Sequence, residues 1–190
     1  MSTAGPSPAG TASTDTSVGS KAWGTPDNIK LDDGTRCSSA TQLSTTLVYT
    51  YYLTATNFGF SIPSGATING VTVVWQASCL RVDGVCVAKD YLCKLIKGGT
   101  IQGNNKAVPT DMTNTDTNYT YGSTSDLWGL TLSETDVNAS NFGVAISYQY
   151  AGNGTQNQGL RVDYMTLSVD YTEASGATFK QSRALLGVGW

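Results

Sequence analysis

The sequence predicts an all-β protein that folds as an antiparallel β-sandwich of the jelly-roll type. Composition is the first observation: 27 of the 190 residues are Thr and ten are Tyr, whereas Glu occurs only at positions 134 and 173. Thr and Tyr suit a pleated, half-buried surface, and the scarcity of Glu removes a common helix former. The second observation is the alternation of apolar and polar residues in short segments separated by turn residues, which is typical of strands that bury one face.

Two short phrases that recur in the same order are the third observation. Asn-Phe-Gly at positions 57–59 is followed by Leu-Arg-Val-Asp at 80–83, and the same two phrases return at 141–143 and 160–163. Two copies at this long period are too few for a solenoid. They fit one domain whose two halves use similar strand pairs, as jelly rolls built from two Greek keys do.

The N-terminal segment, residues 1–22, consists mainly of Ser, Thr, Gly, Ala and Pro. Such a segment has almost nothing to bury, so we expect an unstructured arm unless a partner surface holds it. The compact domain is therefore expected to span residues 23–172.

Alternation predicts the strands of this domain in order. The clearest case begins at position 68, where Val71, Val73, Trp75 and Ala77 share one face. The same pattern predicts strands at 144–150 and 160–171. Shorter apolar segments supply the other candidates, at 47–53, 58–62, 85–96, 119–121 and 127–130.

A helical signal occurs at residues 133–137. Ser133 can cap a helix, and acidic residues follow it in the first turn, where the helix dipole favours negative charge. We expect one or two helical turns there.

The C-terminal segment, residues 173–190, changes character again. Two basic residues precede an apolar end in which Leu185, Leu186, Val188 and Trp190 are the large side chains. An apolar end of this kind is a poor free tail, and aromatic anchors are the usual centre of protein contacts. Such a tail either packs on its own domain or docks into a neighbour, and we expect these four residues to dock into a neighbouring subunit.

The charge balance and the missing histidine exclude several classes of function. Charged residues make up 13% of the chain, the net charge is −3, and there is no His. A weakly acidic surface argues against nucleic-acid binding, and the absence of His removes the commonest general base and zinc ligand. No segment resembles a signal peptide or a membrane span, so we expect neither.

Four cysteines stand at positions 37, 79, 86 and 93, a spacing unlike that of zinc sites. Cys79 and Cys86 flank a predicted hairpin turn, so a cross-strand disulfide between them is one interpretation. Free, buried thiols are the other, and the sequence leaves both open.

A series of phrases in this chain resembles a widespread group of jelly-roll domains found in virion proteins of tailed bacteriophages and related bacterial surface proteins. The phrases lie, in the shared order, at residues 23–28, 32–34, 57–60, 62–71, 126–130, 141–144, 162–164 and 169–171. The resemblance covers about residues 23–172 and neither terminal segment. It implies a non-enzymatic building block of a phage particle, assembled in the host cytoplasm.

From this resemblance and the two terminal segments we predict a capsid decoration or cement protein. Its partners would be other virion proteins, such as the major capsid or tail protein, and further copies of itself. The alternative is a carbohydrate- or receptor-binding module of a phage tail or a bacterial surface protein, which would bind a host glycan.

Three groups of residues are candidate sites for chemistry. Asp27, Asp32 and Asp33 are the densest oxygen cluster, of the ligand type that calcium prefers, although Asp-Asp-Gly is also a natural turn. Asp83 and Asp163 would have to face one cleft to act as a glycosidase pair. Arg–Asp pairing or turn hydrogen bonds are the simpler interpretation of both, so we predict no enzyme.

The polar, Gly-rich loop at 150–158 carries the glycan-binding alternative. Tyr150 could stack on a sugar ring, and Asn153 and Gln156 could hydrogen-bond its hydroxyls. Trp75 and Trp128 are less suited to this role, because one alternates with core residues and the other lies between leucines.

Overall fold

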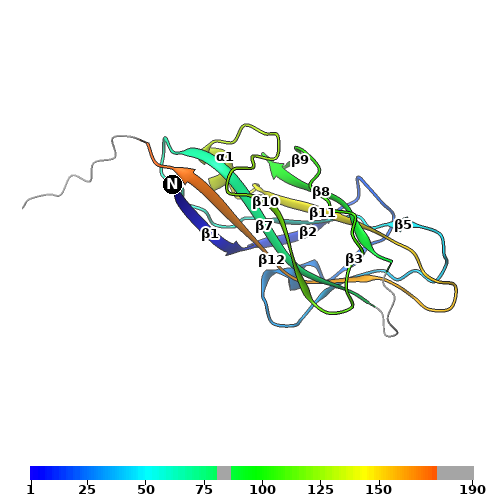
Figure 1. The fold of residues 1–190 in the computed structure, drawn as a ribbon. Helices are drawn as coiled ribbons and strands as arrows, with labels where there is room; N and C mark the ends of the chain where they lie inside the picture. The colour runs from blue at the N-terminus through cyan, green and yellow to red at the C-terminus, as the bar shows by residue number, and fades with distance from the viewer. Residues whose placement is uncertain (81–86, 175–190) are drawn as a thin grey trace, which may run out of the picture.

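A computed structural model describes residues 1–80 and 87–174 as two antiparallel sheets packed face to face (Figure 1). The first sheet has the strand order β10-β7-β12-β4-β3, and β1 also pairs with β12. The second has the order β2-β6-β11-β8-β9, and β5 also pairs with β11. The predicted antiparallel β-sandwich is therefore confirmed.

The first sheet is built from β1 (Ser2–Pro8), β3 (Trp23–Gly24), β4 (Cys37–Ser39), β7 (Thr67–Cys79), β10 (Thr117–Ser123) and β12 (Leu160–Thr172). The second sheet is built from β2 (Thr11–Asp15), β5 (Val48–Tyr49), β6 (Tyr52–Thr56), β8 (Lys89–Lys97), β9 (Thr100–Gln102) and β11 (Gly143–Tyr150). A 3₁₀ helix, η1 (Pro26–Lys30), and a short α-helix, α1 (Glu134–Asn138), lie in the connections. Among the described residues no helix is long and apolar enough to cross a membrane.

The core lies between the sheets and is built from the faces that alternation predicted. Val71, Val73 and Trp75 of β7 are fully buried, and β12 pairs with β7 along most of its length. Trp75 stacks on Tyr121, with ring centroids 4.2 Å apart. Trp128 is also fully buried, so the structural interpretation of both tryptophans is confirmed.

The N-terminal segment is not the unstructured arm that we expected. Ser2–Pro8 forms β1 on β12, and Thr11–Asp15 forms β2 on β6, so each sheet gains an edge strand. Edge strands are held by backbone hydrogen bonds and need little apolar surface, which Ala4, Ala9 and Ala12 supply at the margin of the core. The sandwich therefore begins at residue 2 rather than at residue 23.

The predicted helix cap at Ser133 is confirmed, whereas two of the predicted short strands are absent from the described chain. Ser133 caps α1 in a capping box with Asp136, as its position before the acidic turn predicted. Residues 58–62 form no strand. Phe58, Phe60 and Ile62 are buried, but they belong to an irregular connection. Residues 127–130 are also a turn rather than a strand, with Trp128 in the left-handed region at φ 57°.

Of the described cysteines, two are free thiols and one is in a disulfide, so each of the two interpretations applies to some of them. Cys37 and Cys93 are buried free thiols, and burial raises the pKa of Cys37 to about 12. Cys79 is disulfide-bonded. Cys86, the other half of the predicted hairpin disulfide, lies outside the described residues.

Candidate functional site

A polar groove of about 490 Å³ crosses the outer face of the second sheet. We call it the sheet groove. One wall is β2, through Thr11, Ser13, Thr14 and Asp15, and the floor includes Thr54 and Thr56 of β6. The opposite wall is Ile96, Gly99 and Ile101, from β8, β9 and the turn between them. Asn57, Ser140 and Asn141 close one end.

The sheet is hollow at this place because its central strand carries small side chains. Val144, Ile146 and Tyr148 of β11 point into the core, so Gly143, Ala145 and Ser147 face outward. A Cβ at Gly143 would lie 1.9 Å from the Ala55 carbonyl oxygen, so only glycine lets β6 approach this closely. Larger side chains on the flanking strands then stand above the floor.

The two asparagines of the repeated phrase meet at the end of the groove. Thr56 pairs with Gly143, so the chain leaving β6 at Asn57 lies beside the chain entering β11 from Asn141. Phe58 and Phe142, which follow the asparagines, are both buried and fix the two segments to the core. Both asparagines are exposed, and neither side-chain amide bonds to another residue in the described parts of the chain.

The sequence analysis interpreted these asparagines as scaffold and did not propose them as site residues. The signal that could have found them is the repeat itself. Asn is polar and precedes a buried aromatic residue in both copies, at the ends of two strands that turn out to be neighbours. Only the strand pairing shows that the two copies face one groove.

The two long walls of the groove differ in polarity. The hydroxyls of Ser13 and Thr54 share a hydrogen bond of 2.8 Å, and Thr11 and Ser13 remain exposed to the groove. Ile96 and Ile101 face them and pack in a small apolar cluster with Tyr52. Asp15 is the only ionisable side chain among the groove residues that the structure describes, and its Oδ1 accepts a 2.9 Å hydrogen bond from the Ser17 amide.

A tyrosine pair lies further along the same outer face. Tyr49 pairs with Gln149 of β11 and therefore faces outward, and its ring contacts that of Tyr91, with centroids 4.4 Å apart. Tyr91 is 39% exposed. Tyr52 is close to both Asp15 and Tyr91, and burial, followed by the nearby Asp15 charge, raises its pKa. The outer face of the second sheet thus combines hydroxyls, free amides and aromatic surface.

The predicted calcium ligands do not converge. Asp27 pairs with Lys30, and the Asp33 carboxylate accepts a 2.8 Å hydrogen bond from the Thr35 amide, as in an Asx turn. Within the described part of the chain, no group of three or more acidic, cysteine or histidine side chains is arranged to hold a metal ion. Asp27 and Asp33 serve helix-end and turn contacts instead, so this geometry gives the predicted calcium site no support.

The predicted glycan-binding loop is also different from what we expected. Tyr150 is fully buried, and its hydroxyl donates a hydrogen bond to the Ala40 carbonyl oxygen, so it cannot stack on a ligand. Asn153 Oδ1 accepts hydrogen bonds from the Thr155 and Gln156 amides, at 3.0 and 2.7 Å, and thereby stabilises its own turn. Gln156 is exposed, and its predicted role stays a prediction.

The remaining predicted residues contribute no second site. Asp163 is buried on β12 and accepts a hydrogen bond from the amide of Gly34, so its carboxylate joins two segments that are distant in the sequence. Asp83 and the docking residues Leu185, Leu186, Val188 and Trp190 lie outside the described residues.

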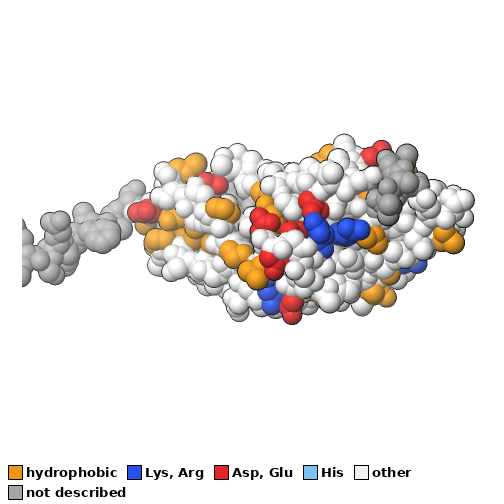
Figure 2. Space-filling view, turned by 90° about the horizontal axis from the view of Figure 1, so that it is seen from below, with side chains coloured by type: hydrophobic (Ala, Val, Ile, Leu, Met, Phe, Trp, Pro, Cys, Tyr) orange, Lys and Arg blue, Asp and Glu red, His pale blue; other side chains and the backbone are white. Residues whose placement is uncertain are grey.

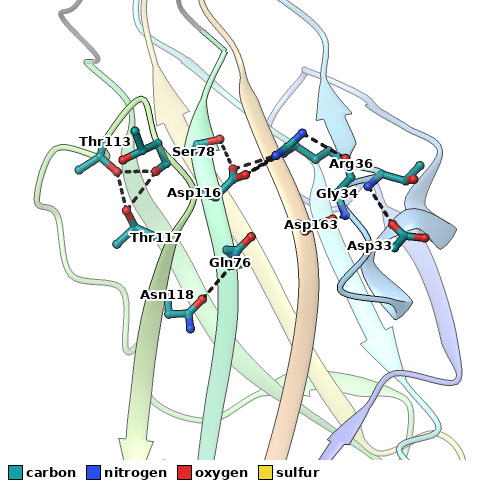
Figure 3. A network of polar contacts seen from close by, with 12 residues as sticks. Asp33, Gly34, Arg36, Gln76, Ser78, Thr113, Asp116, Thr117, Asn118 and Asp163 are labelled. Atoms are coloured by element: carbon teal, nitrogen blue, oxygen red, sulfur yellow. Dashed lines mark hydrogen bonds and ion pairs between the residues drawn. The ribbon is translucent and has the colours of Figure 1, made fainter.

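A polar network covers one end of the first sheet's outer face (Figure 3). Arg36 pairs with Asp116, and Asp116 also accepts a 2.7 Å hydrogen bond from Ser78. The hydrogen bond from Arg36 is the largest cause that lowers the pKa of Asp116. Gln76 donates to Asn118 on the neighbouring strand. Because these groups are bonded to one another, they are less available to a ligand than the free amides of the sheet groove.

A second polar cluster is enclosed between the sheets. Asp90 accepts a hydrogen bond from the Tyr121 hydroxyl, and burial raises the pKa of Asp90 to about 6. Asp90 Oδ1, the Tyr148 hydroxyl and Trp75 Nε1 are buried without a hydrogen-bond partner among the described residues.

Comparisons with known proteins leave the family open. No family model and no curated protein matches the chain. A solved structure described as "CBM4 structure and function", a carbohydrate-binding module, matches 74% of this chain and 87% of its own length at 14% identity, with a TM-score of 0.38. A likeness this distant assigns neither family nor function.

Proposed function

We propose that this protein is a non-enzymatic carbohydrate-binding module that holds a short stretch of uncharged glycan in the sheet groove. The observation that carries the proposal is the pair of free amides, Asn57 and Asn141, above a groove with hydroxyls on one wall and isoleucines on the other.

The chemistry of the groove suits a sugar ring. A side-chain amide offers two donors and two acceptor lone pairs, so it can bond two neighbouring sugar hydroxyls at once. An apolar face of the ring can lie against the partly exposed Ile101, whereas the hydroxyl edge of the ring meets Thr11 and Ser13. Because Asp15 is the one charged group among the described lining residues, the groove disfavours acidic sugars.

The groove supports binding rather than hydrolysis. Glycoside hydrolysis needs two carboxyl groups across the scissile bond, and Asp15 is the only carboxylate among the described groove residues. We expect weak binding, because each net hydrogen bond contributes only about 0.5–1.5 kcal/mol.

The test is a glycan array followed by calorimetric titration of the neutral oligosaccharides that bind. Asn57→Ala and Asn141→Ala should each weaken binding several-fold. Asn114→Ala is the matched control, because Asn114 is an exposed amide outside the groove with no hydrogen bond to a described residue. An array without any neutral glycan bound, or equal affinities for all three variants, would contradict the proposal.

The capsid-decoration hypothesis loses one of its two attachment segments, because β1 and β2 belong to the sandwich. Its virion location, its virion partners and its homo-oligomeric state stay predictions.

A further inference from the structure

A second depression, of about 370 Å³, lies on the other side of the molecule, between β1 and the residues that follow η1. Pro6 and Pro8 of β1 form one wall, and Lys30, Leu31 and Asp32 form the other. Tyr164, Met165 and Thr166 of β12 line it from below. We call it the proline groove, and it shares no residue with the sheet groove.

The walls of the proline groove expose apolar surface. Leu31 is 64% exposed, Pro6 and Pro8 are also exposed, and Tyr164 is half-buried. Figure 2 shows apolar side chains beside a group of acidic and basic ones on one face of the molecule. Exposed apolar surface gains about 25 cal/mol per Å² when a ligand covers it, so a ligand with large apolar side chains is favoured.

One rim of the proline groove, formed by Asp32 and the adjacent Asp33, carries acidic charge that is unpaired among the described residues. Asp32 and Asp33 are exposed and form no ion pair with a basic residue in the described ranges, whereas Lys30 is already paired with Asp27. Close by, Asp163 is 3% exposed, and its Oδ1 has no hydrogen-bond partner among the described residues. The Asp32 charge acts on Asp163, although burial is the larger cause that raises the Asp163 pKa. An occupant with basic groups next to apolar ones fits this surface.

We propose that the chain's own C-terminal segment, residues 180–190, docks in the proline groove. Lys180 and Arg183 match the acidic rim, and the apolar residues Leu185, Leu186 and Trp190 match the proline, leucine and tyrosine walls. The segment and the groove are thus complementary in both charge and polarity. This inference is independent of the proposed glycan binding.

The length of the chain allows this contact within one molecule. The described chain ends at Ala174, and the groove residue Thr166 lies eight positions back along the strand, or about 26 Å at a strand rise of about 3.3 Å per residue. Residues 175–184 can span about 33–36 Å when extended, so Leu185 and the residues after it reach the groove.

A second copy could offer the same groove to the tail, but the intramolecular contact wins at low protein concentration. A short flexible linker gives an effective concentration of about 1 mM, far above a working concentration of about 1 μM. We therefore assign the groove to the tail of the same molecule.

Trp190 provides the readout in the full-length protein. The other tryptophans, Trp23, Trp75 and Trp128, are 6%, 0% and 0% exposed, so acrylamide should quench them poorly. The difference between the wild type and Trp190→Phe isolates the Trp190 emission. The proposal predicts slow quenching of Trp190 in the wild type at low micromolar concentration, in a protein that stays monomeric by light scattering.

Two substitutions, one inside the proline groove and one outside it, test whether the groove protects Trp190. Leu31→Asp should increase the quenching constant of Trp190 several-fold, and because Leu31 is exposed, the domain should stay folded by circular dichroism. Leu43→Asp is the matched control, since Leu43 is also exposed but lies outside the groove, and it should change nothing. Three results overturn the proposal: rapid Trp190 quenching in the wild type, no effect of Leu31→Asp, or protection that disappears on dilution together with a dimer.

Discussion

The outer faces of the two sheets carry similar residue types but use them differently. On the first sheet, Arg36, Asp116 and Ser78 bond to one another, and Asn118 accepts from both Gln76 and Tyr164. On the second sheet, Asn57 and Asn141 have no such partner among the described residues and stand beside a groove. Polar side chains that bond to each other stabilise the fold modestly, whereas free ones beside a concavity are available to a ligand. The comparison shows that polarity alone does not identify a binding face.

The largest effect is expected from filling the sheet groove. Thr56→Trp places a large ring among the groove residues. Because residue 56 faces outward and is partly exposed, the substitution should leave the core intact. It should abolish glycan binding in the titration, a loss of at least about a hundredfold, or about 2.7 kcal/mol. Thr120→Trp, on the exposed edge of the first sheet, is the matched control and should bind as the wild type does. If both variants lose binding, the second sheet is not the binding face.

The pH dependence of stability should have opposite signs in the core and on the first sheet. Asp90 has a folded pKa of about 6 against 3.8 when unfolded, so the native state holds more protons between these values. The free energy of unfolding should therefore fall as pH rises from about 4 to about 6, by at most about 3 kcal/mol. Asp90→Asn should flatten this slope, as measured by denaturant unfolding at several pH values.

Asp116 supplies the contrast within that experiment. Its folded pKa is lowered, chiefly by the hydrogen bond from Arg36, so its contribution is present above pH 3.8 and is lost as pH falls below it. Asp116→Asn should therefore change the profile on the acid side only. A wild-type profile that stays level between pH 4 and pH 6 would show that Asp90 is not the buried acid that its environment indicates.

A smaller effect is expected from breaking the first sheet's network. Arg36→Ala should lower the free energy of unfolding by about 1 kcal/mol or less, because the pair is partly exposed and solvent screens it. Glycan affinity should be unchanged. Asn141→Ala should show the reverse, with stability within about 0.5 kcal/mol of the wild type and weaker binding. Loss of glycan binding in Arg36→Ala would contradict the distinction between the bonded network of the first sheet and the binding face of the second.

Local patterns predicted a good part of this fold. Alternation found β7, β11 and β12, because a strand that buries one face must alternate, and the capping signal at Ser133 found α1. The same patterns failed for residues 1–22, since edge strands depend on backbone hydrogen bonds that any small side chain permits. Sequence reasoning chose Tyr150 as a ligand contact, although its place in an alternating strand already indicated a buried side chain.

The sequence by itself determined the sandwich, its buried tryptophans, the absence of histidine chemistry and the repeated Asn-Phe-Gly phrase. Which of these residues meet was decided by tertiary structure. Asn57 and Asn141 are 84 positions apart in the chain and become neighbours only because β6 and β11 pair antiparallel. A groove forms there because Gly143 and Ala145 occupy the central strand between larger neighbours, and such cross-strand differences in side-chain size have no signature in a linear pattern.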